Sequence, residues 1–361
     1  MRRLATAVVV ASIAAGAQAA PLPQGVYRGT IGTLPVHLCM GLRGADANGA
    51  YYYDRVGKAI PLQPSGNAFV EGHDPDDAKA PRLRIDSTLK GSWSSGKSTL
   101  PVQLTRVKIG PVADELGPCG AMEFQSPRLR PPTIKRQAQQ HMGHKITVLT
   151  FKPAGFESIS MQSFQLDRAG AGVAKVNALL AAAMPSRLPR VGDMWLDCVR
   201  FANDANGNDG DYDETIEPAV ISSRWMSVSE NSGSYCGGAH PESSLQFRNF
   251  DLEKGVEVDL LDWFGPKAVK VEKYDGEASK TLTPAFRAAI LKGWKTQGDA
   301  ECQSVVGDAE YWSVGIGPGK LMFQPSLPHV AQACGETFVV EHARVAPWMT
   351  PAGKALLATL P

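Results

Sequence analysis

The sequence has almost no net charge and no long hydrophobic run in its body. Its 361 residues include 37 lysines and arginines against 36 aspartates and glutamates, which leaves a formal charge of +1. Proteins that bind nucleic acid through its phosphates usually carry a basic excess, so we expect no nucleic-acid partner. Beyond the N-terminus, no stretch reaches the roughly 18 apolar residues that a membrane-spanning helix needs. We therefore expect no transmembrane segment.

Several signatures of catalytic and cofactor sites are also missing. The sequence contains no Gly-x-Ser-x-Gly elbow, no His-Glu-x-x-His motif and no phosphate-binding glycine loop followed by Lys-Ser or Lys-Thr. It also lacks the closely spaced cysteine pairs of structural zinc sites. The sequence thus predicts no cofactor, no metal site and no catalytic residues, and it favours a binding protein over an enzyme.

The first 20 residues have the pattern of a secretory signal peptide. Two arginines precede an apolar run over 4–15, which is too short to cross a bilayer and ends in an Ala-x-Ala site. Cleavage near Ala19 and Ala20 would release a periplasmic or secreted protein. A retained N-terminal anchor is the alternative.

The six cysteines are widely spaced and even in number. In an oxidising compartment such a set usually forms disulfides, although sequence alone leaves many pairings open. A free nucleophilic thiol at Cys236, which lies among glycines, is the functional alternative. Joining neighbours in chain order predicts the pairs Cys39–Cys119, Cys198–Cys236 and Cys302–Cys334.

Two folded domains are expected. Residues 21–107 show short strands separated by turn residues, which indicates a small all-β barrel or sandwich, and 25–32 with 49–53 loosely resemble β-rich modules of exported bacterial proteins. Residues 108–143 contain prolines and basic residues without clear periodicity, which suggests a linker. Residues 144–361 mix strands with amphipathic helices, which indicates an α+β domain with an antiparallel sheet and packed helices.

Individual elements of the second domain can also be predicted. Apolar residues recur at helical spacing over 173–184 and again over 282–294, so we expect a helix in each range. The apolar run over 194–202 is expected to be a strand. It would be followed in the sheet by strands over 220–229 and 245–251.

The segment 203–217 is strongly acidic and contains no Lys or Arg. Its first half alternates like the opening ligands of an EF-hand, but Asp209 stands where that motif needs Gly and Thr215 where it needs Glu. Three interpretations remain: a solvated hairpin loop between two strands, an irregular calcium loop, or an acidic loop that steers a basic partner. In the last case, Asp211 and Asp213 are candidate contact residues.

A glycine-rich turn follows the acidic segment. Gly237 and Gly238 permit positive φ and close backbone approach, while Pro241 keeps the backbone of His240 extended. The imidazole could then project beside Tyr235 and contact a ligand. Alternatively, the turn is a strand end whose histidine bonds to a neighbouring carbonyl.

The turn begins a longer pattern that resembles a known family. Residues 235–241 read YCGGAHP, 250–255 read FDLEKG and 260–264 read LLDWF. This pattern resembles the extracellular domain of the RsiV anti-sigma factors, which also precedes the catalytic domain of the PdaC deacetylases. The resemblance covers about 144–361. It implies a binding module, and the partner it implies is a lysozyme-like hydrolase.

These features predict an exported cell-envelope binding protein without catalytic activity, which recognises a lysozyme-like protein or a cell-wall ligand such as a peptidoglycan fragment. A cell-wall hydrolase or deacetylase with a site assembled from distant residues is the alternative, and an architectural envelope protein is a third. The candidate binding residues are Asp211, Asp213, Tyr235, Gly237, Gly238 and His240.

Overall fold

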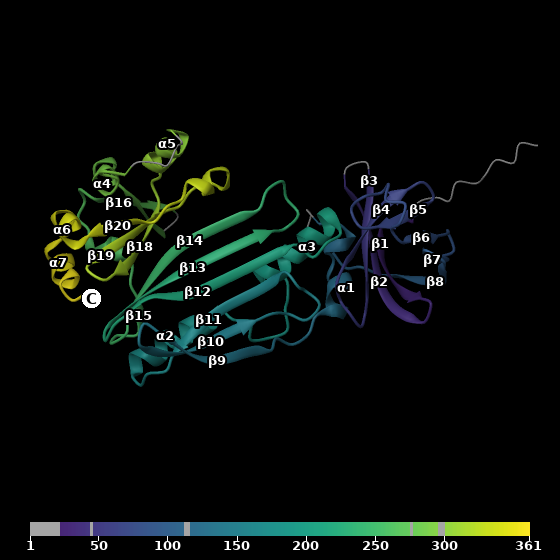
Figure 1. The fold of residues 1–361 in the computed structure, drawn as a ribbon, viewed down its shortest axis with the longest axis horizontal. Helices are drawn as coiled ribbons and strands as arrows, with labels where there is room; N and C mark the ends of the chain where they lie inside the picture. Colours follow the sequence, from purple (N-terminus) through teal and green to yellow (C-terminus); the bar gives the residue numbers. More distant parts are fainter. Residues whose placement is uncertain (1–21, 44–45, 112–115, 275–276, 295–299) are drawn as a thin grey trace, which may run out of the picture.

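The computed structural model describes residues 22–43, 46–111, 116–274, 277–294 and 300–361; the predicted signal peptide, 1–20, lies outside these ranges. The molecule is elongated, with a barrel at one end, a seven-stranded sheet in the middle and a C-terminal lobe at the other end (Figure 1). In the described ranges, no helix is long and apolar enough to cross a membrane.

The N-terminal barrel forms because eight strands pair antiparallel in chain order and β1 then closes onto β8. Alternate side chains point inward, and Tyr27, Leu38 and Tyr51 are among those fully buried in the interior. The barrel therefore encloses a packed core. Its strands are β1 (Gly25–Ile31), β2 (Leu34–Arg43), β3 (Asp46–Tyr53), β4 (Ile60–Ser65), β5 (Ala68–Glu71), β6 (Arg82–Ile85), β7 (Lys90–Ser95) and β8 (Ser98–Val107).

The outer face of β1–β3 is apolar too, and short helices cover it. Phe124 packs on Tyr52 with ring centroids 5.1 Å apart, and a disulfide joins Cys39 in β2 to Cys119. These contacts fix the barrel to the segment that leads into the second domain. The short helices are η1 (Pro118–Gly120), α1 (Met122–Gln125) and η2 (Ser126–Arg128).

The second domain is built on a sheet in the order β15-β14-β13-β12-β11-β10-β9, antiparallel except between β11 and β12. β9 lies in the stretch 108–143 that the sequence suggests as a linker. Most of its side chains are exposed, so the apolar alternation that signals a strand is missing. The strands are β9 (Ile134–His141), β10 (His144–Phe151), β11 (Ile159–Leu166), β12 (Asp211–Ile221), β13 (Trp225–Tyr235), β14 (Glu242–Asp251) and β15 (Val256–Glu257).

Two helices pack on one face of this sheet, namely α2 (Ala171–Ala182) and α3 (Met194–Asn206). The helix α2 agrees with the expected one, but the strand expected over 194–202 is wrong. Trp195, Val199 and Ala202 are buried, and their spacing is that of one helix face. The helix ends at Gly207, whose φ of 73° allows a left-handed cap.

The C-terminal lobe contains the β16–β17 hairpin, a three-stranded sheet and several short helices. The predicted motif at 260–264 contributes Leu260, Leu261, Trp263 and Phe264 to its core. The motif is therefore structural here. The elements are η3 (Leu260–Trp263), β16 (Val269–Tyr274), β17 (Glu277–Leu282), α4 (Pro284–Ile290), α5 (Ala300–Asp308), β18 (Trp312–Gly317), β19 (Lys320–Pro325), η4 (His329–Cys334), β20 (Phe338–Glu341), α6 (His342–Val345), η5 (Ala346–Trp348) and α7 (Pro351–Leu357).

Buried polar contacts hold the lobe against the other face of the sheet. The Asn249 side-chain amide donates to the Val314 carbonyl at 2.7 Å, and the Ile316 N–H donates to the Ser227 hydroxyl at 3.1 Å. The same hydroxyl donates to Asn249 Oδ1 at 2.9 Å. Because buried polar atoms are costly when unpaired, this network fixes β18 across β13 and β14.

Three disulfides join the pairs that chain order predicts, Cys39–Cys119, Cys198–Cys236 and Cys302–Cys334. Cys236 is therefore no free nucleophile. Three disulfides fit an exported protein, because such bonds persist in oxidising compartments. The closed barrel followed by sheets with packed helices confirms the predicted fold class.

Candidate functional site

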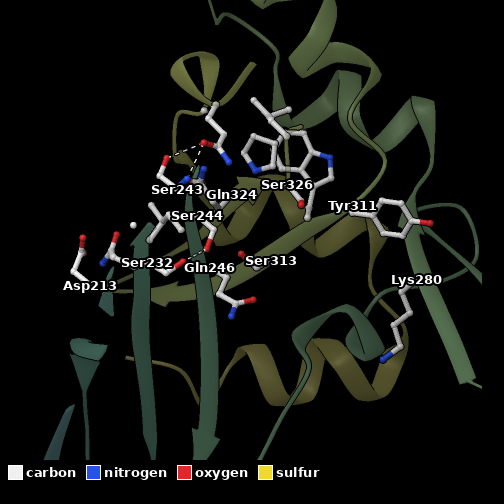
Figure 2. Close-up of a pocket in the computed structure, with 18 residues that line it drawn as sticks. Asp213, Ser232, Ser243, Ser244, Gln246, Lys280, Tyr311, Ser313, Gln324 and Ser326 are labelled. Carbon is white, nitrogen blue, oxygen red and sulfur yellow. Dashed lines mark hydrogen bonds between the residues drawn. The ribbon is translucent and has the colours of Figure 1, made fainter. Parts of the chain in front are cut away.

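A polar groove of about 650 Å³ lies between β14 and the C-terminal lobe (Figure 2). Its apolar surface comes from residues such as Leu245 and from Tyr311, whose side chain is 54% exposed. A groove with many neutral hydrogen-bonding groups suits an extended polar ligand. Hydroxyl and amide groups in its lining come from Asn231, Ser232, Ser243, Ser244, Gln246, Ser313, Gln324, Ser326 and Gln332.

One wall of the groove is the outer edge of β14. This strand pairs with β13 along almost its whole length, whereas β15 reaches it only near residue 250. Side chains of the lobe contact the rest of the edge: Gln332 Oε1 accepts the Ser243 N–H at 2.9 Å. Ser313 Oγ accepts the Phe247 N–H at 3.1 Å. The lobe thus occupies two positions of the edge with side chains instead of a neighbouring strand.

Two charged residues line the groove, Asp213 and Lys280, on opposite sides of it (Figure 2). Lys280 contacts the carboxylates of Asp259 and Asp262, each at 2.6 Å. Partial burial opposes the charge of Lys280, but these two carboxylates hold its pKa above the ordinary value. Asp213 is exposed and has no ion pair among the described residues. The groove therefore carries one uncompensated negative charge.

The predicted glycine turn lies beside the groove. Gly237 is buried with φ of 88°, and a Cβ there would lie 2.6 Å from the Ala205 Cβ, whereas Gly238 has open space around it. His240 is exposed and stacks on His329 with ring centroids 5.7 Å apart. All three predicted turn residues line a hollow of about 350 Å³ that also includes Glu242. The turn thus borders the groove without belonging to its lining.

Tyr235 and Asp211 face each other where β13 ends and β12 begins. Of the six predicted binding residues, Asp213 alone belongs to the lining of the polar groove. The structure therefore distributes the predicted residues over neighbouring surfaces instead of gathering them in one pocket.

The acidic segment is not a hairpin loop between two strands, which is the first of its three interpretations from the sequence. It comprises the end of α3, a short turn and the start of β12, and its first acidic groups bind a barrel loop and the segment that follows the barrel. Asp204 Oδ2 accepts the Gly117 N–H at 2.8 Å, and Asp209 Oδ2 accepts the Ala59 N–H at 3.0 Å. Within the described ranges, no three potential metal ligands of the His, Cys, Asp and Glu types gather in one place.

A second pocket, of about 340 Å³, lies between α3 and β12 and is lined in part by Tyr212, Glu214, Met161 and Trp195. The Tyr212 hydroxyl donates to Glu214 Oε2 at 2.9 Å. Burial raises the pKa of Glu214 above its ordinary value, while the Tyr212 bond partly offsets that effect. This is the one carboxyl in a described pocket whose pKa is raised.

Apart from Asp213, the residues of the polar groove cannot be identified from the sequence. They come from β12, β13, β14, β17, β18, β19 and η4, so no local motif contains them. Serines and glutamines such as Ser243 and Gln332 are common on ordinary surfaces. Only the way the C-terminal lobe folds back onto the sheet shows that they share a groove.

No model of a known protein family matches the sequence, and no curated protein does. Among solved structures, the chain is similar to a DUF3298 family protein from Pseudomonas aeruginosa PAO1, with 13% identity and a TM-score of 0.37 over 62% of this chain and 97% of that one. It is also similar to a DUF3298 family member from Bacteroides fragilis NCTC 9343, with 11% identity and a TM-score of 0.36 over 64% and 96%.

Proposed function

We propose that this protein is an exported cell-envelope binding protein without catalytic activity, and that it recognises a protein ligand in the polar groove between β14 and the C-terminal lobe. The observation that carries the proposal is the groove itself, which is neutral in most of its lining and rich in hydrogen-bonding groups. The partner implied by the resemblance of 235–264 is a lysozyme-like hydrolase. A cell-wall ligand such as a peptidoglycan fragment is the other ligand class.

Charge near the groove supports a basic partner. Asp211 and Asp213 are exposed on β12. They are two residues apart in the strand, so both side chains point to the face of the sheet on which the C-terminal lobe packs. Exposed carboxylates attract a positively charged protein and raise its rate of association more than they lower its rate of dissociation.

Calorimetry with purified lysozyme at low salt tests this proposal. We expect binding, and we expect the double variant Asp211→Asn, Asp213→Asn to weaken it about 2- to 10-fold, mainly through slower association. The variant Asp76→Asn, Asp77→Asn removes the same charge from an exposed barrel loop and serves as the control. Absence of lysozyme binding at low salt would refute the lysozyme partner, and binding of peptidoglycan fragments alone would assign the groove to the cell wall.

The second candidate function is a cell-wall hydrolase or deacetylase, which the raised pKa of Glu214 favours. A half-buried carboxyl whose pKa is raised holds its proton to higher pH than an exposed one, which is a property of a general acid. Turnover of muropeptides by the purified protein, lost on Glu214→Gln or on His240→Ala, would support this function. A purified protein that leaves muropeptides unchanged would exclude it for that substrate.

A further inference from the structure

We infer that β14 takes up an extended peptide segment of the binding partner as an additional strand, with Leu245 at the centre of the pairing. This inference rests on the proposed function and deepens it, because it names the chemical class of the ligand and the atoms that bind it. It concerns the five residues 243–247 at the edge of the sheet.

The direction of the backbone groups follows from the contacts of the lobe. In an antiparallel pair, every second residue turns both its N–H and its C=O away from the partner strand. The N–H groups of Ser243 and Phe247 point outward, because Gln332 and Ser313 accept them. Leu245 lies midway between these residues, so its N–H and C=O also point outward, and it lines the groove.

Apart from the N–H groups of Ser243 and Phe247, these outward groups have no partner among the described residues of the groove. In the part of the chain that the structure describes, no hydrogen bond from outside β13 reaches the Leu245 N–H or the outward carbonyls of Ser243, Leu245 and Phe247. The three carbonyls repeat at about 6.8 Å, which is the two-residue period of a strand. A second strand presents backbone groups at the same period, and a peptide therefore matches this edge better than a glycan does.

The two outer edges of the sheet differ in their protection. β9 carries the charged, exposed side chains of Lys135 and Arg136, which discourage pairing with another chain. In β14, residues 243–247 contain no charge and no proline. Instead, this edge lines the groove, and side chains of the lobe contact it at Ser243 and Phe247. The β14 edge thus lacks the charges that discourage pairing on β9, and it leaves the backbone groups of Leu245 available to a peptide.

The lining also defines the peptide. Side chains of an added strand alternate between the two sides of its sheet, and here they would meet hydroxyl and amide groups such as those of Ser244, Gln246 and Ser326. Lys280 is neutralised by its two aspartates, whereas Asp213 is not. The ligand is therefore an extended, mostly polar segment with a basic residue at the end near Asp213, bound by strand addition.

Nuclear magnetic resonance on the full chain tests this pairing. The probe is a capped peptide of alternating threonine and valine with one terminal lysine, used at millimolar concentration. Its control has the same sequence with every backbone nitrogen methylated, which removes the donors from both edges. We expect the unmodified peptide to shift the Leu245 amide signal and slow its hydrogen exchange at least 10-fold, and we expect the methylated peptide to do neither. Equal effects of both peptides, or none from either, would overturn the inference.

A pair of variants tests the same atoms from the protein side. Leu245→Pro removes the outward N–H, a change that an edge strand tolerates because that group forms no ladder bond, and Leu245→Ala keeps the N–H. We expect Leu245→Pro to weaken peptide binding at least 10-fold and Leu245→Ala to leave it within about 3-fold. If Leu245→Pro fails to fold, the methylated peptide still decides the question.

Two further outcomes separate this inference from the proposed function. Lysozyme binding that is sensitive to Asp213→Asn but unaffected by Leu245→Pro would keep the binding function and refute strand addition. Peptide pairing at Leu245 without any lysozyme binding would keep strand addition and refute the lysozyme partner. Binding of an N-acetylglucosamine oligosaccharide in place of the peptide, unaffected by Leu245→Pro, would assign the groove to a glycan and overturn the inference.

Discussion

Gly237 and Gly238 are adjacent in the predicted motif, but they meet different physical constraints. Gly237 has a left-handed φ of 88° and lies against α3, where a Cβ would approach the Ala205 Cβ to 2.6 Å. Gly238 is exposed, and a Cβ there would have no atom within 4 Å. Gly237 is therefore required for close packing of the turn on α3, and Gly238 is not.

We expect Gly237→Ala to destabilise the protein by about 2–4 kcal/mol, because it adds backbone strain and overpacking together. Gly238→Ala is the matched control and should change the free energy of unfolding by no more than about 0.5 kcal/mol. Urea unfolding of both variants measures the difference. A similar loss in both would show that the turn is constrained by something other than its contact with α3.

The Glu214 carboxyl gives stability a dependence on pH. Because burial raises its folded pKa above the ordinary value of 4.5, the folded state binds the proton more tightly than the unfolded state. Its contribution is therefore full at low pH and is lost as the pH rises through the folded pKa. Glu214→Gln cannot ionise and keeps the acceptor for the Tyr212 hydroxyl. We expect equal melting temperatures near pH 4 and a more stable variant near pH 8; a constant difference across this range would contradict the assignment.

At the scale of elements, Asp251 fixes the turn between β14 and β15. Its Oδ1 accepts the N–H groups of Glu253 and Lys254 at 3.0 and 3.1 Å, and Arg224 binds its Oδ2 at 3.0 Å. Burial opposes ionisation of Asp251, but these donors outweigh that effect and lower its pKa. The shape of this turn is thus set by one buried carboxylate.

We expect Asp251→Ala to destabilise the protein by about 2–4 kcal/mol, because it leaves two N–H groups and a guanidinium without their acceptor. Asp262→Ala, in the neighbouring motif, is the control: that side chain is 63% exposed and, among the described residues, its carboxylate binds only Lys280, so its loss should cost at most about 1 kcal/mol. Thermal unfolding of the two variants compares them. An equal loss of stability in both variants would show that the Asp251 carboxylate does not have this special role in the turn.

Elements that bury one face and expose the other could be predicted from the sequence, because burial gives them a regular pattern of apolar residues. The barrel strands alternate because one face of each fills the barrel, and α2 shows one apolar face toward the sheet. The short apolar run over 194–202 fits a strand as well as a helix. Only the structure shows that Trp195, Val199 and Ala202 are buried along one face of a helix. β9 could not be found, because a strand exposed on both faces has no apolar pattern. The groove could not be found either, because it joins residues from 213 to 335.

At the scale of the whole molecule, Arg128 connects the barrel to the second domain. Its side chain is fully buried and binds the Gly57 carbonyl at 3.0 Å, the Asn203 side chain at 2.6 Å and the Asp209 carboxylate at 2.5 Å. Its guanidinium also lies 4.5 Å from the ring centroid of Phe156. Gly57 belongs to the barrel and the other partners to the second domain, so one side chain satisfies polar groups of both.

We expect Arg128→Ala to destabilise the protein by about 3–5 kcal/mol, because it leaves the Asp209 carboxylate partly buried without its cation. Arg130→Ala is the matched control: Arg130 is exposed and, in the part of the chain that the structure describes, it binds only the carbonyls of Pro127 and Leu129. Loss of the Arg128 side chain should also let the two domains unfold at different temperatures. Calorimetry should show one transition for the parent and for Arg130→Ala and two for Arg128→Ala, with the Cys39–Cys119 disulfide intact in all three proteins. One cooperative transition in Arg128→Ala would show that the disulfide and the packing of Phe124 couple the domains without the arginine.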